Sequence, residues 1–413
     1  MNKIGLKYLF AIITFIIYIY SVNINLLPLS LKQLLAVIGL FVFLFNLRHI
    51  RKTKMFLSLL MICLSIQFWG LITCLLNNSN EYYYLNKYLI STCSSFFASF
   101  LICKLFSSCI NSVDDFFKFT LYAVLVESLL TVLIFAIPSL YDFADSIGLI
   151  IIDERVKENI FAQYRRFNGI GEAIYFGVIP SCSFGVMSGL YLQMKNRNTY
   201  KYIFIVIIIS VISFFVARYS GIVVGVCFLI YFRHLLRGSK IKFLKFSIVA
   251  MVILALIIKT AVSLLPEQIL NWAMAVFDSD SSRGGSKYTV INWLLSTSFE
   301  NKTFIIGDAQ YTNADGSYYG HVDIGLFRQI FYGGIIGFLL VFFLHKRIIK
   351  CINNLLPNDP NVIFFTFGML LSYLVSLLKG DLSMVDLLLF VLVNITFIVT
   401  KNEELNRLQK NNI

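Results

Sequence analysis

The chain has 413 residues, of which 58% are hydrophobic and only 14% are charged, whereas soluble domains carry about 25% charged residues. Together with a mean hydropathy of +0.79, this composition excludes an ordinary soluble protein and indicates an integral membrane protein. The formal net charge of +13 does not indicate a nucleic-acid partner, because short basic loops that face anionic lipid account for it.

A helix that spans a membrane needs about 20 mostly apolar residues. We count twelve such stretches and therefore expect an all-α, polytopic membrane helix bundle that forms one integral membrane domain over residues 1–413. The first stretch is predicted to be an uncleaved helix, because no small-residue cleavage site follows it. The twelve stretches lie near residues 7–22, 31–47, 55–76, 88–106, 119–137, 170–193, 202–217, 219–236, 246–264, 325–344, 361–378 and 384–400.

The seventh and eighth stretches form one apolar run that is too long for one span and short for two. Arg218 and Gly221 lie inside this run. A charged residue and a glycine at such a position predict a tight turn between two helices or a broken helix.

The distribution of basic residues predicts the orientation. Most of the 35 Lys and Arg residues fall on the side that holds both termini, and His49, His234 and His345 fall there too. Cytoplasmic loops carry an excess of Lys and Arg, so both termini are predicted to be cytoplasmic. His321 is then the one external histidine.

Two external loops are long, a first over residues 138–168 and a second over residues 265–324. Long loops in compact proteins are often functional. The second loop is predicted to be partly helical, because Ser286 can cap a helix that carries Tyr288, Ile291 and Trp293.

Arginines on the external side run against the charge bias of the chain, which makes them candidates for holding an anion. They are Arg165, Arg166, Arg218 and Arg283, and a guanidinium matches phosphate oxygens in a bidentate way. A helix that starts near Gly171 would aim its positive end at the same anion. The alternative is that these arginines pair with nearby glutamates, contact lipid headgroups or, for Arg218, extend to the outer interface.

Three further candidate functional residues lie at the end of the second loop, where the chain re-enters the membrane. They are His321, Asp323 and Arg328. His321 can act as a general base near neutral pH, and Asp323 can orient it or act itself. Arg328 is a further candidate for binding a diphosphate. The alternative reading is that Asp323 caps the next helix and that the histidine is interfacial.

Other patterns are weaker. Asp278 and Asp280 could hold a divalent ion, but a short pair in a serine-rich loop is more typical of turn chemistry, so we expect no metal and no cofactor. Asp381, Asp386 and Glu127 are weaker candidates for function. The eight cysteines form no CxxC pair, and the sequence has no P-loop, GxSxG, HExxH or zinc pattern.

The chain resembles the Wzy-type O-antigen polymerases, within a group of membrane glycosyltransferases that also contains the O-antigen ligases. The resemblance covers the architecture of the whole chain and three local segments. They are Arg166-Phe-Asn-Gly169, the Arg218-Tyr-Ser-Gly221 turn, and the stretch from Arg283 to His321-Val-Asp323-Ile-Gly325 with Gly333-Gly334-Ile-Ile-Gly337 after it.

The resemblance implies a glycosyltransferase of the bacterial inner (cytoplasmic) membrane. It would move a growing glycan from undecaprenyl diphosphate to a new lipid-linked repeat unit at the periplasmic face. Arg166, Arg218 and Arg283 would bind the diphosphate, and His321 or Asp323 would activate the acceptor. The implied partners are undecaprenyl-diphosphate-linked oligosaccharides, membrane lipids, a chain-length regulator and a flippase.

Three other classes of protein compete with the polymerase interpretation. An O-antigen ligase would carry out the same kind of transfer onto lipid A-core, but ligases usually have Asn after the histidine, whereas Val322 follows His321 here. A lipid-linked oligosaccharide flippase would carry charged residues along its spans and few long external loops. A secondary transporter would show inverted repeats and paired broken helices.

Overall fold

The computed structural model describes residues 3–46, 53–150, 167, 169–171, 177–196, 200–238, 298–314, 317–322 and 324–411, with isolated positions between 247 and 295. Its elements are helical, apart from two isolated bridges between strand-like residues. They are α1 (Lys3–Ile19), α2 (Leu31–Phe45), α3 (Thr53–Asn77), the π-helix η2 (Leu85–Ile90), α4 (Ser91–Phe106), α5 (Val113–Ala136), α6 (Pro138–Ser146), α9 (Val178–Lys195), α10 (Lys201–Val216), α11 (Ser220–Gly238), α15 (Asn301–Ile305), the 3₁₀-helix η5 (Tyr319–His321), α16 (Gly325–Leu355), α17 (Pro360–Ser376) and α18 (Val385–Asn411).

Within this described part, four helices are long and apolar enough to cross a membrane, and five shorter helices are also apolar. The four are Met55–Asn77, Leu85–Phe106, Val113–Ala136 and Val385–Glu404. Large apolar side chains remain exposed on outward faces, with Phe45 at 87% and Leu75 at 77% exposure. Such faces suit a lipid surrounding, and the fold is that of an α-helical membrane protein.

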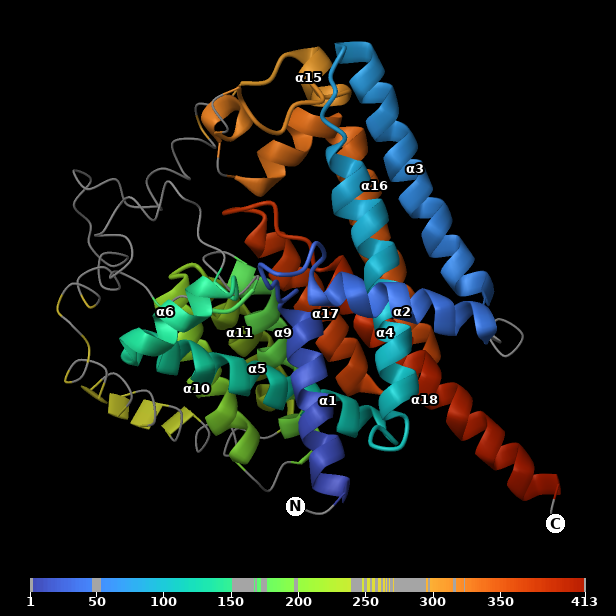
Figure 1. Cartoon of the computed structure of the whole chain (residues 1–413), viewed down its shortest axis with the longest axis vertical. Helices are drawn as coiled ribbons and strands as arrows, with labels where there is room; N and C mark the ends of the chain where they lie inside the picture. Colours follow the sequence, from blue (N-terminus) through green and yellow to red (C-terminus); the bar gives the residue numbers. More distant parts are fainter. Residues whose placement is uncertain are drawn as a thin grey trace.

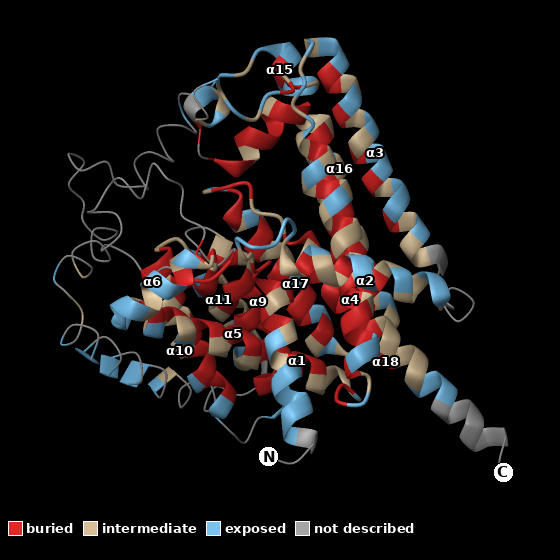
Figure 2. Ribbon diagram, in the orientation of Figure 1, coloured by how far each residue is buried: buried red, intermediate tan, exposed pale blue. Residues whose placement is uncertain are grey.

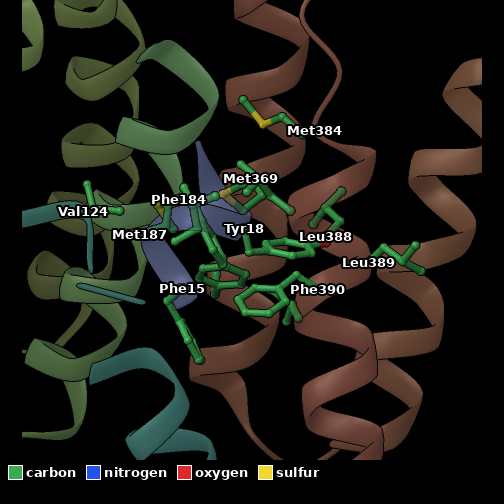
Figure 3. Close-up of a cluster of buried hydrophobic side chains, with 14 of the residues drawn as sticks. Phe15, Tyr18, Val124, Phe184, Met187, Met369, Met384, Leu388, Leu389 and Phe390 are labelled. Carbon is green, nitrogen blue, oxygen red and sulfur yellow. The ribbon is translucent and has the colours of Figure 1, made fainter. Parts of the chain in front are cut away.

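The helices pack around a buried centre (Figure 2). α9 lies among α5, α10, α11 and α17, and every side chain from Ser181 to Met194 is buried. In the close-up of Figure 3, the aromatic side chains of α1 meet α18: the rings of Phe15 and Tyr18 lie 5.0 and 4.1 Å from the ring of Phe390. These contacts hold the first and last helices of the chain together.

Both chain ends lie at the lower edge of Figure 1, whereas α15 and the upper ends of α3 and α16 lie at the opposite edge.

The turn predicted at Arg218 is confirmed: α10 ends at Val216 and α11 begins at Ser220. The turn is closed by the main-chain N–H of Ser220, which donates to the carbonyl of Ala217 at 2.8 Å.

The stretch predicted as a single span near 325–344 is interrupted at Gly334, which has φ 63° and ψ −172°. The main-chain N–H of Leu326, before the break, donates to Leu377 at 3.1 Å. His345, after the break, accepts from the N–H of Met384 at 3.3 Å. The chain therefore changes direction at Gly334, so that both halves of α16 reach the short connection between α17 and α18.

The break is stabilised by partners far away in the sequence. The N–H groups of Asp308 and Ala309 donate to the carbonyls of Phe331 and Tyr332, at 2.6 and 3.1 Å. The indole of Trp69 donates to the carbonyl of Gly333 at 2.7 Å. Carbonyls that the break removes from the helix ladder are thus hydrogen-bonded, as buried backbone groups must be.

Gly334→Ala is expected to lower the melting temperature of the purified protein. Backbone angles of this kind are essentially limited to glycine, and the misfit costs on the order of 1–3 kcal/mol. An added Cβ would also meet the main chain of Ile305. The matched control is Gly225→Ala in α11, where a Cβ has nothing within 4 Å. Equal melting temperatures for the two variants would contradict the break at Gly334.

Candidate functional site

A buried carboxylate, that of Asp381, lies in the connection between α17 and α18 and is 5% exposed. Its Oδ1 accepts from Gln329 at 2.7 Å, and its Oδ2 accepts from the hydroxyls of Tyr311 at 3.2 Å and of Tyr83. No basic side chain among the described residues lies within 4.0 Å of these oxygens. The carboxylate is therefore held by neutral donors and not by a counter-ion.

The donors come from three separate parts of the fold. Tyr83 precedes η2, Gln329 lies in the first half of α16, and Tyr311 lies in the segment between α15 and η5. Gln329 is itself fixed, because its amide donates to Tyr88 at 2.6 Å and its carbonyl accepts from Tyr84 at 3.2 Å. The geometry around Asp381 thus depends on how η2, the first half of α16 and the segment between α15 and η5 pack together.

The segment that carries Tyr311 is hydrogen-bonded to Glu81, in the loop that follows α3. The carboxylate of Glu81 accepts from the N–H groups of Tyr311 and Thr312, at 2.5 and 3.0 Å, and from the Thr312 hydroxyl. The ring of Tyr311 stacks on Tyr83 at 3.7 Å. Burial first, and the charge of Asp381 second, raise the pKa of Tyr311 and of Tyr83 above the ordinary value. Both phenols therefore stay protonated and able to donate to Asp381.

Arg328 is the second feature of the site. Its side chain is buried, with 8% exposure, and its guanidinium lies between the rings of Tyr311 and Tyr318, at 4.1 and 3.6 Å. Its buried Nε has no hydrogen-bond partner, and no described carboxylate forms an ion pair with it. A buried cation without an anion is costly, which makes this guanidinium a strong candidate for binding an anionic ligand.

A cavity of about 370 Å³ borders the Asp381 network, because Tyr83 and Lys87 line it. Lys87 also donates to the main-chain carbonyl of Asp381 at 3.1 Å. Inside the cavity, Lys32 forms an ion pair with Asp386 at 2.7 Å. Ammonium, carboxylate, amide and aromatic groups converge there, which suits a polar ligand with several hydroxyl groups.

The residues that the sequence singled out are distributed unevenly over this site. Arg328 lies in it, between Tyr311 and Tyr318, and its binding of an anion stays a prediction. Arg218 lies in the turn whose Tyr219 hydroxyl donates to Val375 at 2.9 Å, near the end of α17. The main chain of His321 lies in η5, directly after the Tyr318 segment. Outside the described residues lie Arg165, Arg166, Arg283, Asp323 and the pair Asp278 and Asp280, together with the side chain of His321.

The helix predicted to start near Gly171 does not include Gly171 itself, and residues 172–176 lie outside the described residues. α9 begins at Val178, and Gly171 has φ +56°, which is not a helical value. Its N–H donates to the carbonyl of Leu149 at 2.8 Å. This N–H is therefore not available to an anion.

His345, which the charge distribution assigns to the cytoplasmic side, lies within the second half of α16. It is fully buried, stacks on Tyr373 at 3.8 Å, and contacts the N–H of Met384 at 3.3 Å. The change of direction at Gly334 brings it there. His345 thus supports the connection that carries Asp381.

Sequence reasoning missed the tyrosines of this site. Tyrosine clusters such as those around Tyr83 and Tyr318 most commonly form an interfacial aromatic belt in membrane proteins, so they do not stand out as site residues. Tyr311 and Gln329 gave no signal at all. The one sequence signal here is Arg328, since an ionisable residue within a predicted span is by default a functional candidate.

Comparisons with known protein families, with curated proteins and with solved structures found no match to this chain. The class that the fold and the site define is an α-helical membrane protein with a buried, polar, aromatic-rich site at one end. Within the described residues, no group of three or more His, Cys, Asp or Glu side chains forms a candidate metal site.

Proposed function

We propose that this protein is a membrane glycosyltransferase of the O-antigen polymerase type. It would transfer a growing undecaprenyl-diphosphate-linked glycan onto a lipid-linked repeat unit at the periplasmic face of the inner membrane. The observation that carries the proposal is the buried guanidinium of Arg328, which lies close to the buried carboxylate of Asp381, neither of them forming an ion pair with another described residue. Tyr311 contacts both groups, which sets them side by side.

In this proposal, Arg328 binds the diphosphate of the donor lipid. The guanidinium stabilises the negative charge that develops on the leaving group as the bond from the sugar carbon to the diphosphate oxygen breaks. Asp381 accepts the proton of the acceptor hydroxyl while the new glycosidic bond forms. Arg218 and His321 lie near the same end of the chain's helices and remain candidates for further contacts with the lipids.

The membrane layout is part of the proposal: about twelve spans, two long periplasmic loops and cytoplasmic termini. Support comes from the two chain ends, which lie at the same edge of Figure 1. It also comes from Arg328 at the start of α16, Lys87 in η2 and Asp381 in the connection between α17 and α18, which belong to one site. The cavity beside Asp381 would receive the acceptor sugar, since its groups are those that bind hydroxyls.

The test is to delete the gene in its host, restore the wild type and separate the extracted surface glycolipids on a gel. A polymerase predicts core lipid with a single repeat in the deletion strain, and long ladders after complementation. Core lipid without any repeat, with long lipid-linked polymer accumulating behind it, would instead identify a ligase. Accumulation of single lipid-linked repeats on the cytoplasmic side would identify a flippase.

A further inference from the structure

A second cavity, of about 570 Å³, lies at the other end of the helices from Asp381. It is bounded by the end of α2, the start of α3, the end of α4 and the second half of α18. Three of these helices, α3, α4 and α18, contain candidate membrane spans. The volume lies within the range of roughly 300–1,000 Å³ that is typical of ligand sites.

The walls of this cavity are aromatic. Phe43 packs against Phe96 and Phe100, with ring centroids 5.3 Å apart in both pairs, and Phe56 packs against Phe96 at 4.7 Å. Phe397 of α18 completes the lining. Edge-to-face and tilted contacts of this kind fix the rings against each other, so the apolar wall is preformed.

The rim is basic. Lys104 is exposed, and its ammonium has no hydrogen bond or ion pair with any described residue. Lys401 is held in place, because its Nζ donates to the carbonyl of Ser107 and to Asn111, both at 2.8 Å. Glu404 is the one carboxylate that lines the cavity, so the described lining carries a net charge of about +1 at neutral pH.

We propose that this cavity binds an anionic glycerophospholipid, with one acyl chain among the phenylalanine rings and the phosphate at Lys104 and Lys401. The combination of an apolar, preformed wall and a cationic rim matches the two chemically distinct ends of such a lipid. Lysines near a membrane surface attract anionic headgroups. The site is separate from the Asp381 network and does not depend on the function proposed above.

The proposal is tested by titrating the purified full-length protein in detergent with dioleoyl phosphatidylglycerol, and with phosphatidylcholine of the same chains. Bound lipid is counted by native mass spectrometry, and the melting temperature is recorded alongside. Phosphatidylglycerol is expected to bind at least about tenfold more tightly than phosphatidylcholine and to raise the melting temperature. Equal affinity for the two lipids would overturn the assignment of an anionic ligand.

Two kinds of variant locate the lipid. The double variant Lys104→Gln and Lys401→Gln is expected to lose the preference for phosphatidylglycerol, whereas Lys346→Gln with Lys350→Gln, two exposed lysines of α16, should keep it. Thr396→Trp, or Thr400→Trp if the first variant fails to fold, should fill the cavity and weaken binding at least about tenfold. Undiminished binding in the filled variant would place the lipid elsewhere and overturn the proposal.

Discussion

Arg328→Met is expected to abolish elongation of the surface glycan while leaving the protein folded. Methionine keeps much of the apolar volume between Tyr311 and Tyr318 but removes the charge, for which the described residues supply no counter-ion. Loss of one group that stabilises a developing negative charge typically lowers turnover by about 10²–10³-fold. Complementation of the deletion strain, scored by glycolipid ladders and by protein level, measures both effects.

The melting temperature of the variant distinguishes an anion-binding role of Arg328 from a purely structural one. Removing a buried charge that forms no ion pair with a described residue relieves a desolvation penalty, which offsets the lost stacking on Tyr311 and Tyr318, so the melting temperature of Arg328→Met should change little. Arg328→Lys should also lose most activity, because an ammonium neither stacks between two rings nor forms bidentate hydrogen bonds to a diphosphate. Lys302→Ala, which removes an exposed cation of α15, is the control and should keep full ladders. Loss of stability together with activity in Arg328→Met would contradict the anion-binding role.

Asp381→Asn is expected to stop elongation as completely as the Arg328 variant. The amide has the same shape, and Tyr83 and Tyr311 can turn their hydroxyls to accept from it, so the network around the side chain survives. The change removes the group that would take the acceptor proton, and such groups contribute typically 10²–10⁴-fold to rate.

Donor binding distinguishes the roles of the two residues. Asp381→Asn should still bind the lipid-linked donor with wild-type affinity, because Arg328 is intact, whereas Arg328→Met should bind it weakly. Asp142→Asn, a change in an exposed carboxylate of α6, serves as the control and should leave elongation unchanged. Wild-type ladders from Asp381→Asn at normal protein level would show that this carboxylate is not the base.

The sequence predicts those parts of the fold that are set by local chemistry. The turn at Arg218 followed from a cation and a glycine inside an apolar run, and its position was correct. The start of α9 was expected near Gly171, because glycine is common near helix ends. Gly171 instead lies in an isolated bridge, where its N–H donates to the carbonyl of Leu149. Local patterns do not contain that pairing.

The candidate site depends on contacts that the sequence does not contain. Asp381 receives hydrogen bonds from Tyr83 and Tyr311, which lie 298 and 70 positions away along the chain. The break at Gly334 was visible only as a run of glycines, and its effect depends on docking of the segment around Asp308. Arg328 could be singled out from the sequence because a charged side chain inside a span is rare.

The most direct test of the central claim is an assay of the purified protein in vesicles that contain undecaprenyl-diphosphate-linked repeat units from the host. The account predicts glycans of two and more repeats, with one undecaprenyl diphosphate released for each new bond, and neither product with Arg328→Met. Repeat units that stay single in the presence of folded wild-type protein, with no undecaprenyl diphosphate released, would contradict the proposed polymerase function.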